Sequence, residues 1–390
     1  MITGVPHVKA PIRWGMVGGG RNAQIGYSHR SAALRDASFA LLAGAFDIDP
    51  ARGKAFGVEL GLAPERGYGN YSDMFEAEAK RPDGVQAVTV CTPNSTHYEI
   101  AKVALEHGLH VVCEKPLCFT VAQAEELRDL SLAVRKIVGV TYGYSGYQMI
   151  EQARAMVANG DLGEIRVVNL QFAHGFHSAP VEQGDESARW RVDPRVSGPS
   201  YVLGDLGTHP LYIAETILPG LKIKRLMCAR QSFVKSRAPL EDNAVTLMEY
   251  DNGAFGTVWC SAVNAGATHS QKVRIVGSKA SVEWWYEHPN QLSYEIQGEP
   301  PRLLDRGMPY LYPSARVDDR VGGGHAEGYF DAWSNLYYRF AMAMEASDAG
   351  DSARLASVRF PDVHAGVQGV RWVENCVRSA DAGGVWIDYR

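Results

Sequence analysis

Several hallmarks of common protein classes are missing from these 390 residues. The sequence has no apolar run long enough to cross a bilayer, no charged-then-apolar leader, and no basic stripe with interleaved aromatic residues. Its formal net charge of -5 is spread along the chain without a run of like charges. We therefore expect a cytoplasmic protein that binds neither a membrane nor a nucleic acid.

A metal-binding or disulfide pattern is also absent. The six cysteines are scattered and form no C-x-x-C pair, which excludes a zinc knuckle and a disulfide framework. The histidines of the segment HGFH, His174 and His177, have no third ligand nearby, and in a strand they would point to opposite faces. We expect reduced thiols and no bound metal.

The pattern of apolar residues predicts an α/β chain with two domains. From Ile12 to about Val140, five short apolar runs alternate with helical patterns, which is typical of a parallel sheet built from βαβ units. After Tyr147 six strand-like runs follow one another with few helices. We predict a Rossmann domain over residues 1–140. Residues 141–390 should form an α+β domain with a large open, mostly antiparallel sheet, for substrate binding and oligomerisation.

Two segments near the C-terminus, residues 330–346 and 362–380, have the periodicity of amphipathic helices. We expect both to cover one face of the second sheet.

The first strand-like run leads directly into a glycine-rich turn. Gly18, Gly20 and Ala23 have the G-x-G-x-x-A spacing, with Arg21 and Asn22 between the second glycine and the alanine. Gly18 allows a tight turn, Gly20 lets the backbone approach a pyrophosphate, and Ala23 lets the following helix pack on the strand. In the first βαβ unit this spacing predicts that the five residues bind a dinucleotide.

Two acidic residues follow the second run. Asp47 stands at the strand end, where a carboxylate accepts hydrogen bonds from the adenosine ribose and repels a 2′-phosphate. Ile48 comes next, where an arginine would have favoured that phosphate. Asp49 precedes Pro50, which is typical of a helix N-cap with proline at the first turn. We assign Asp47 to NAD and Asp49 to capping.

Polar loops follow the third and fourth runs, at the strand ends where ligands of open α/β sheets bind. The loop residues that we assign to the cofactor are Thr92, Pro93, Asn94, His97, Glu114 and Lys115.

Three longer segments carry a resemblance to a known family. They read TPNSTHYEIAKVALEHGLHVVCEKP from Thr92, WRVDP from Trp190 and GDLGTH from Gly204. With the glycine-rich turn, they resemble the glucose-fructose oxidoreductase, inositol dehydrogenase and MocA (Gfo/Idh/MocA) family of pyridine-nucleotide enzymes over nearly the whole chain.

The resemblance also implies catalytic residues. By it, Lys115 is the lysine of the family's E-K-P motif, and Asp205 and His209 are its D-x-x-x-H pair. The family often has an aspartate three residues after that histidine, where this chain has Tyr212. One positioning group is therefore undefined.

The residue types suit alcohol oxidation. If GDLGTH enters a helix, Asp205 and His209 lie on one face, so that a carboxylate and an imidazole reach one substrate alcohol. Histidine is a competent base near neutral pH, and a lysine or carboxylate can hold the alcohol. Either His209 or Lys115 can be the base. The residues that we expect to bind substrate are Lys115, Tyr144, Arg191, Asp205, His209 and, in a glycine-rich loop, His325.

We therefore predict an NAD-dependent oxidoreductase that takes a hydride from a ring hydroxyl of a sugar or cyclitol and works as a homodimer or homotetramer. One alternative is a glycosidase in which retained NAD transiently oxidises a glycoside, including an anionic one. A second is an NAD-dependent sensor without catalysis, although such a protein would not need Lys115, Asp205 and His209 together.

Overall fold

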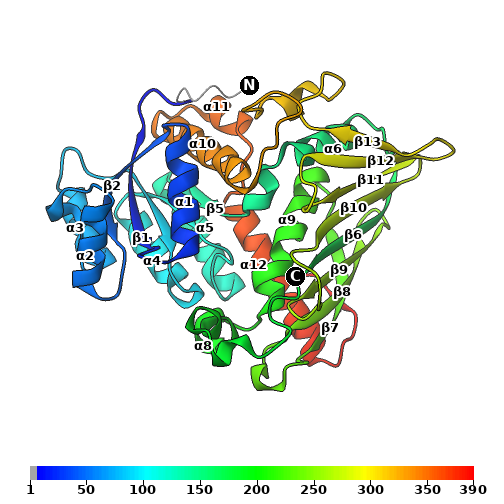
Figure 1. Ribbon diagram of the computed structural model, residues 1–390, viewed down its shortest axis with the longest axis horizontal. Coiled ribbons are helices and arrows are strands. Elements are labelled where there is room, and N and C mark those ends of the chain that lie inside the picture. The colour runs from blue at the N-terminus through cyan, green and yellow to red at the C-terminus, as the bar shows by residue number, and fades with distance from the viewer. Residues whose placement is uncertain (1–6) are drawn as a thin grey trace. The chain divides into compact units, whose positions relative to one another are not determined.

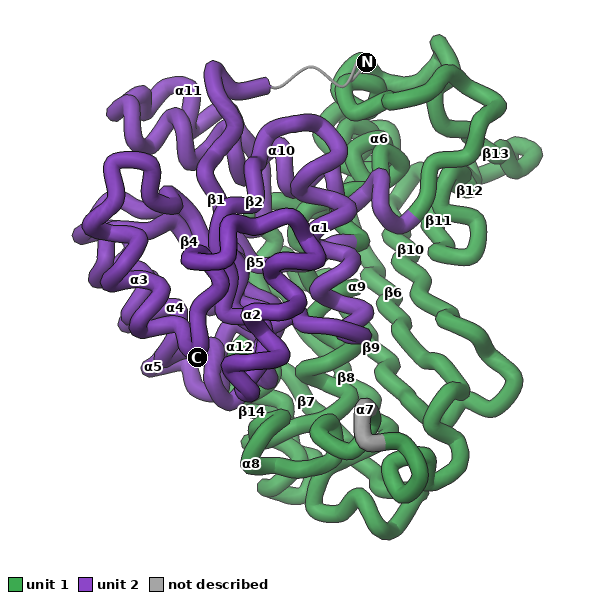
Figure 2. The backbone as a smooth tube through the Cα atoms, turned by 60° about the vertical axis from the view of Figure 1, so that its left-hand side comes forward, with its two compact units in different colours: residues 1–2, 144–328, 369–390 green, residues 3–143, 329–368 purple. Residues whose placement is uncertain are grey.

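The computed structural model describes residues 7–390, apart from the side chains of residues 186 and 187. The chain forms two compact units, which Figure 2 shows in different colours. One unit contains residues 7–143 and 329–368 and is called here the parallel-sheet unit. The other contains residues 144–328 and 369–390 and is called the open-sheet unit.

The parallel-sheet unit is built from five strands and the helices between them (Figure 1). The strands are β1 (Ile12–Gly18), β2 (Phe39–Ala45), β3 (Ala87–Cys91), β4 (His110–Cys113) and β5 (Val138–Val140). The helices are α1 (Gln24–Arg35), α2 (Pro50–Glu59), α3 (Tyr71–Ala79), α4 (His97–Glu106), α5 (Val121–Val134), α10 (Tyr329–Asp348) and α11 (Ser352–Ser357). The sheet order is β2-β1-β3-β4-β5, and every neighbouring pair is parallel. The predicted Rossmann arrangement is confirmed.

Helix starts in this unit follow local signals in the sequence. The Asp49 carboxylate accepts the backbone N–H groups of Ala51 and Arg52, as the capping assignment predicts. At α5 the Thr120 hydroxyl accepts the N–H of Gln123, whose side chain bonds back to the Thr120 N–H. Such reciprocal caps satisfy backbone donors that a first helical turn leaves unpaired.

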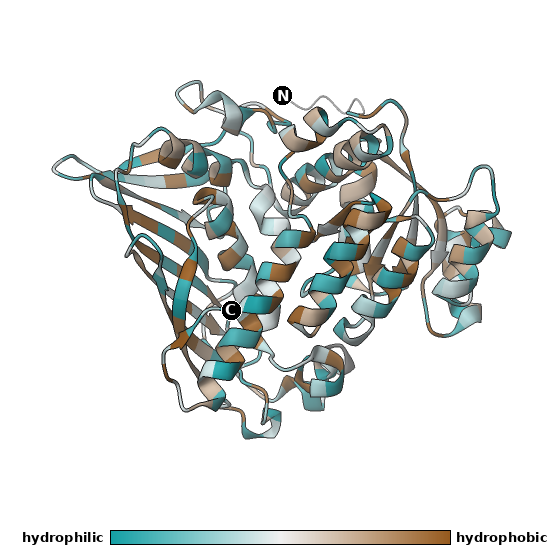
Figure 3. Ribbon diagram, turned by 180° about the vertical axis from the view of Figure 1, so that it is seen from behind, coloured by the Kyte–Doolittle hydropathy of each residue, from teal (hydrophilic) through white to brown (hydrophobic). Residues whose placement is uncertain are grey.

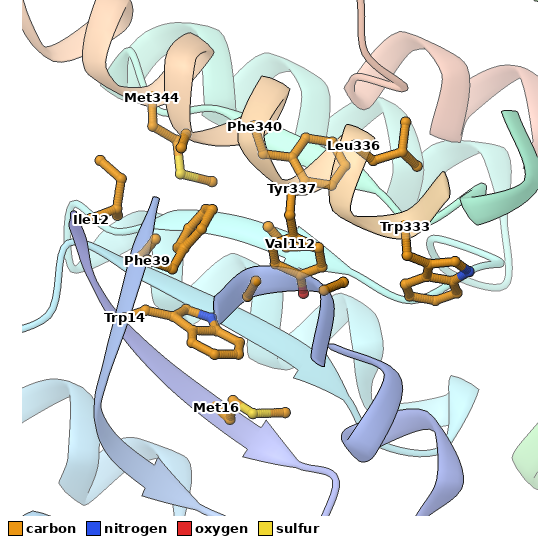
Figure 4. Packing of buried hydrophobic residues seen from close by; sticks show 14 of the residues in the cluster. Ile12, Trp14, Met16, Phe39, Val112, Trp333, Leu336, Tyr337, Phe340 and Met344 are labelled. Carbon is orange, nitrogen blue, oxygen red and sulfur yellow. The ribbon is translucent and has the colours of Figure 1, made fainter. Parts of the chain in front are cut away.

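Helix α10 lies in the parallel-sheet unit, so the expectation that it covers the second sheet is wrong. Its buried Tyr337, Phe340 and Met344 join a cluster with Trp14 and Phe39 of the parallel strands (Figure 4). Amphipathic periodicity shows that a helix has an apolar face, but not which sheet that face covers. The compact units therefore differ from a single division at residue 140, because residues 329–368 belong to the parallel-sheet unit.

The open-sheet unit contains a nine-stranded sheet in the order β13-β12-β11-β10-β6-β9-β8-β7-β14. Its strands are β6 (Ile165–Ala173), β7 (Ile223–Gln231), β8 (Asn243–Tyr250), β9 (Phe255–Ser261), β10 (Gln271–Gly277), β11 (Ala280–Trp285), β12 (Gln291–Ile296), β13 (Arg302–Asp305) and β14 (Ile387–Asp388). Its helices are α6 (Gln148–Ala158), α7 (Glu186–Arg189), α8 (Pro194–Ser197) and α9 (Thr208–Ile217), and it shares α12 (Val363–Asp381) with the other unit. Only β6 and β9 pair in parallel among the described strands of this sheet, which confirms the mostly antiparallel prediction.

The second half of α12 packs against strands β7 and β8 of the nine-stranded sheet. The Cys228 N–H of β7 donates to Ser379 Oγ over 2.9 Å, and Thr246 Oγ1 of β8 lies 3.5 Å from Cys376 Sγ. Hydrophobic and hydrophilic residues alternate along the helices in Figure 3, as expected for helices with one buried face. Within residues 7–390, no helix is both long enough and apolar enough to span a membrane.

Candidate active site

The glycine-rich turn at the end of β1 has the backbone that a dinucleotide needs. Gly18 has a left-handed φ of +80°, and a Cβ there would lie 2.7 Å from the carbonyl oxygen of Cys91. A Cβ on Gly20 would lie 2.6 Å from the carbonyl oxygen of Phe46. Side chains are therefore excluded where the chain turns into the N-terminus of α1, so a pyrophosphate can approach the backbone N–H groups and the positive end of the helix dipole.

Close packing of α1 on β1 depends on a residue other than Ala23. A Cβ added to Gly26 would lie 2.3 Å from the Gly19 carbonyl oxygen, so only glycine fits at this contact. Ala23 is instead the N-cap of α1, and Asn22 before it has a left-handed φ of 69°. The spacing rule assigns the packing role to Ala23, but Gly26, three residues later, makes the close contact with Gly19, directly after the end of β1.

The predicted ribose residue, Asp47, has a partner that local sequence did not suggest. Its carboxylate accepts two hydrogen bonds from the Arg52 guanidinium, at 2.8 and 3.2 Å, and one from the Asp49 N–H at 2.9 Å. The bonds from Arg52 and Asp49 lower the pKa of Asp47 from its ordinary value. Arg21 pairs with Glu59 of α2. An arginine is therefore present at Asp47, although it comes from the first turn of α2 and not from position 48.

The loops after β3 and β4 are tied together by a buried histidine. His97 Nε2 lies 2.9 Å from the carbonyl oxygen of Thr92, and Nδ1 lies 2.9 Å from that of Pro116. Burial lowers the pKa of His97, while the two carbonyl contacts oppose that change. The His97 side chain is wholly buried and holds the loop, and its assignment to the cofactor stays a prediction. Pro93 is exposed, and Asn94 begins a short helical turn.

Lys115 lies immediately after β4, next to a buried carboxylate. The Lys115 N–H donates to Glu114 Oε2 over 3.3 Å, and His29 Nε2 of α1 lies 3.2 Å from Glu114 Oε1. Burial by itself would raise the pKa of Glu114, but the nearby His29 and Lys115 hold it below its ordinary value. The chain therefore places an ionised carboxylate beside its E-K-P lysine.

The D-x-x-x-H pair lies in the open-sheet unit, at the start of α9. Asp205 is in a single turn of π-helix, Leu203–Gly207, that runs into α9, and His209 is the second residue of that helix. Both residues are therefore helical, as the sequence predicted. A wide helical turn of this kind is often found at functional sites. Tyr212 lies half-buried on the next turn of α9.

An arginine from the loop before α8 holds the Asp205 carboxylate. Arg191 Nε donates to Asp205 Oδ2 over 3.3 Å, and its guanidinium lies 4.6 Å from the centroid of the Trp190 ring. Arg191 and Asp205, both predicted substrate residues, are thus brought together, and their charges offset each other.

Tyr144 joins His209 to a second histidine that the sequence did not single out. The Tyr144 ring meets the His209 ring edge to face, with centroids 4.8 Å apart, and its hydroxyl lies 3.1 Å from His269 Nε2. His269 is stacked between Phe172 at 4.3 Å and Tyr286 at 3.9 Å. This packing buries His269 and lowers its pKa to about 3. A neutral imidazole therefore orients the Tyr144 hydroxyl, while the Tyr144 ring packs against His209.

The two histidines of HGFH converge. Since β6 ends at Ala173, His174 and His177 lie in the loop beyond it, with ring centroids 5.5 Å apart, so the expectation of opposite faces is wrong. Burial lowers the pKa of His174 to about 4, against the opposing charge of Asp205, and also lowers that of His177, which bonds to the Tyr201 hydroxyl. In the part of the chain that the structure describes, no three His, Cys, Asp or Glu side chains are grouped to hold a metal ion.

The predicted loop histidine, His325, has an exposed side chain. Its backbone carbonyl accepts a hydrogen bond from the buried Arg306, which also pairs with Asp319 and Glu327. The glycine-rich loop is therefore anchored. A role for His325 in substrate binding stays a prediction.

Lys115 and the cofactor residues lie in one unit, and Asp205, His209, Arg191 and Tyr144 lie in the other. Similarity to known proteins covers both units. Residues 12–142 match the Gfo/Idh/MocA oxidoreductase family, NAD-binding Rossmann fold, and residues 154–388 match its C-terminal alpha/beta domain. The chain belongs to the Gfo/Idh/MocA family. It is therefore an oxidoreductase with an NAD-binding Rossmann fold, as the sequence motifs predicted.

Individual members of the Gfo/Idh/MocA family are similar over the full length. The oxidoreductase YfiI of Bacillus subtilis is 54% identical over 394 residues, covering 100% of both chains. A crystal structure of an inositol dehydrogenase homolog from Azotobacter vinelandii complexed with NAD+ has a TM-score of 0.99 and 69% identity, covering 100% of both chains. The same homolog complexed with NADH and myo-inositol has a TM-score of 0.96 and 68% identity, again covering 100% of both chains.

Proposed function

We propose that this enzyme catalyses the reversible, NAD-linked oxidation of a secondary ring hydroxyl in an uncharged cyclitol or sugar, with inositols as the first class of substrate. The observation that carries this function is the cluster around His209. A base, a carboxylate held by Arg191, and an oriented tyrosine hydroxyl lie together in one unit. Such groups bind a polyol and remove a proton from it.

Charge in this cluster favours a neutral substrate. His174 and His269 are uncharged near neutral pH, because burial lowers their pKa values to about 4 and about 3. Arg191 is paired with Asp205, and the buried Arg237 is paired with Glu182. Hydrogen-bonding groups without excess positive charge suit hydroxyls better than a phosphate or a carboxylate.

Each predicted catalytic residue has a distinct part in the reaction. His209 takes the proton of the alcohol, while Asp205 holds the hydroxyl in place. Lys115 stabilises the oxygen as its charge develops. When bound, NAD supplies the hydride acceptor, and Gly18, Gly20 and Asp47 are the residues that hold its pyrophosphate and ribose.

Similarity to a homolog crystallised with NADH and myo-inositol supports inositols as the first compounds to test. The oligomer that we expect is a homodimer or homotetramer, since open sheet faces commonly become subunit interfaces.

A spectrophotometric assay of NADH formation tests this function. The panel contains inositols, aldoses, neutral glycosides and the corresponding sugar phosphates, each with NAD at alkaline pH. We expect turnover of at least one neutral polyol, with kcat/KM for its phosphate lower by about 10-fold or more, because Arg191 and Arg237 near His209 are already paired with carboxylates. His209→Asn is the matched control, since it should remove turnover while keeping NAD binding.

Two results would contradict the proposed function. Preference for a phosphorylated or carboxylated sugar would overturn the argument from charge. Cleavage of a glycoside by enzyme with retained NAD, without consumption of added cofactor, would instead identify the oxidoreductive glycosidase.

A further inference from the structure

A chain of buried polar side chains runs through the core of the parallel-sheet unit and ends beside Lys115. Trp14 Nε1 lies 3.0 Å from Thr89 Oγ1, which lies 3.0 Å from the Tyr337 hydroxyl. That hydroxyl lies 2.6 Å from His29 Nδ1, and His29 Nε2 lies 3.2 Å from Glu114 Oε1. Figure 4 shows Tyr337 reaching from α10 toward the strand that carries Trp14.

The two ends of this chain limit the directions that its hydrogen bonds can take. An indole N–H only donates, and an ionised carboxylate only accepts. Thr89 therefore accepts from Trp14, and in the arrangement proposed below Thr89 donates to Tyr337 and Tyr337 donates to His29 Nδ1. With Nδ1 as an acceptor, the proton of a neutral His29 is on Nε2, where it faces the carboxylate of Glu114. This contact is long and bent for a hydrogen bond, so its strength depends on how the ring is held.

The carboxylate at the end of the chain has two neighbours at Oε1, because the Thr141 hydroxyl donates to the oxygen that faces His29 Nε2. Glu114 is 8% exposed, and an ionised carboxylate removed from water is costly unless partners compensate. The titratable groups that face it from the surrounding elements are His29, Cys91, His97, Cys113, Lys115 and Tyr337. Burial raises the pKa values of the thiols and the phenol, so these groups stay neutral and add no charge. His29, Lys115 and the Thr141 hydroxyl together hold Glu114 in its ionised form.

We propose that His29 is a positioning residue for Lys115: Tyr337 holds it as the Nε2–H tautomer, and it fixes the Glu114 carboxylate against the backbone N–H of Lys115. The consequence for catalysis rests on the proposed function, in which Lys115 stabilises the reacting oxygen. A histidine held in one tautomer by a second partner orients its carboxylate more strictly than a freely rotating donor does.

The tautomer is measured without any substrate. Side-chain nitrogen NMR of the full-length, uniformly 15N-labelled protein reports which ring nitrogen carries the proton, and the His29→Gln spectrum assigns the signals. We expect Nε2 of His29 to be protonated and Nδ1 to accept the proton of the Tyr337 hydroxyl. In Tyr337→Phe the Nδ1 signal should move, since that nitrogen loses its donor. A doubly protonated His29, or a proton on Nδ1, would overturn the assignment.

Kinetics test the effect on Lys115, with a second buried histidine as the matched control. His110 is also wholly buried in this unit and also contacts a carboxylate, Asp348 Oδ1 at 3.0 Å, but that carboxylate is not next to Lys115. We expect His29→Leu to lower kcat by about 10- to 100-fold, as small displacements of catalytic groups do, and to leave NAD affinity within a few fold. His110→Leu should lower thermal stability without this loss of kcat.

The pH profile separates positioning from simple destabilisation. Without His29, the buried Glu114 should protonate at higher pH, so His29→Leu should acquire a new acid limb, with activity lost as pH falls. His29→Gln should restore part of kcat, because its amide can donate to Glu114. Equal kcat and equal pH profiles in His29→Leu and His110→Leu would contradict the positioning role. Absence of NADH formation in the wild type would instead count against the proposed function, and the NMR result would still decide the tautomer.

Discussion

Cofactor choice depends on two side chains at the end of β2. Asp47 is at the position where a carboxylate binds the ribose of NAD, but both of its oxygens are bonded to Arg52. An arginine near this position accommodates the 2′-phosphate of NADP. The same arginine that now neutralises Asp47 is therefore placed to bind that phosphate once the carboxylate is removed.

We predict a preference for NAD in the wild type and a shift toward NADP in Asp47→Ser. The shift should need Arg52, so Asp47→Ser combined with Arg52→Ala should lose the gain in kcat/KM for NADP. Steady-state kinetics with both cofactors measure this on any accepted polyol. The role of Asp47 would be wrong if the wild type used NADP as well as NAD.

His209 and Lys115 are rival candidates for the base. If His209 takes the proton, His209→Ala should lower kcat by about 10² to 10⁴ fold, the usual contribution of general acid-base catalysis, and should remove the pH dependence near neutrality. Lys115→Ala should lower kcat by at least as much, but should keep the pH dependence near neutrality. If Lys115 is the base, Lys115→Ala should instead remove an alkaline limb of the pH-rate profile. A pH-rate series on both variants decides which residue is the base. An unchanged kcat and pH profile in His209→Ala would show that the D-x-x-x-H segment has a structural role only.

At the level of elements, α10 completes the core of a domain from which it is separated by nearly 200 residues of sequence. Phe340 on α10 is wholly buried, and a Cβ added to Gly139 of β5 would lie 2.5 Å from its ring. The ring thus occupies the space that the missing side chain of Gly139 leaves open.

We predict that Phe340→Ala destabilises the parallel-sheet unit by about 3 to 5 kcal/mol, because a large buried ring is lost and a cavity stays behind. Denaturant unfolding measures the loss in free energy of unfolding, and hydrogen exchange shows which strands are destabilised. Amides of β1 and β3 should lose protection before those of β6 and β9. Met342→Ala, at a partly buried position on the same helix, should cost less. Loss of protection centred on β6 and β9 would contradict the assignment of α10.

At the level of the whole molecule, the outer face of the nine-stranded sheet exposes apolar side chains. Val245 of β8 is 40% exposed, Phe255 of β9 is 39% exposed, and Trp386 beside β14 is 36% exposed. The rings of Phe255 and Trp386 lie edge to face, with centroids 5.9 Å apart. An exposed apolar surface on an open sheet is typical of an interaction site.

We therefore predict a homodimer or homotetramer that associates through this face. Analytical ultracentrifugation of the wild type should give two or four times the mass of one chain. Val245→Arg combined with Phe255→Lys should shift the protein toward the monomer without unfolding it, since both positions are partly exposed. Tyr27→Lys, at an exposed aromatic residue of the other unit, is the control. A wild type that stays monomeric at high concentration would refute this assembly.

The sequence by itself determined the parts of this protein that depend on short stretches of chain. All five parallel strands and six of the nine strands in the second sheet were predicted from apolar runs, and the Asp49 cap was predicted from its neighbours. The glycine-rich turn, Lys115 and the D-x-x-x-H pair were likewise predicted from local motifs. Periodicity, caps and turn residues act within one or two turns of helix or strand, so they can be read without the fold.

Only the tertiary structure decided which distant segments meet. The sequence could not place α10 on the parallel sheet, Arg52 on Asp47, or His269 against Tyr144. It also could not show that the Tyr337 hydroxyl meets His29, because 308 residues separate the two. An apolar face or a polar side chain has the same local pattern whichever partner it meets, and the partner is selected by packing and hydrogen bonding in the folded chain.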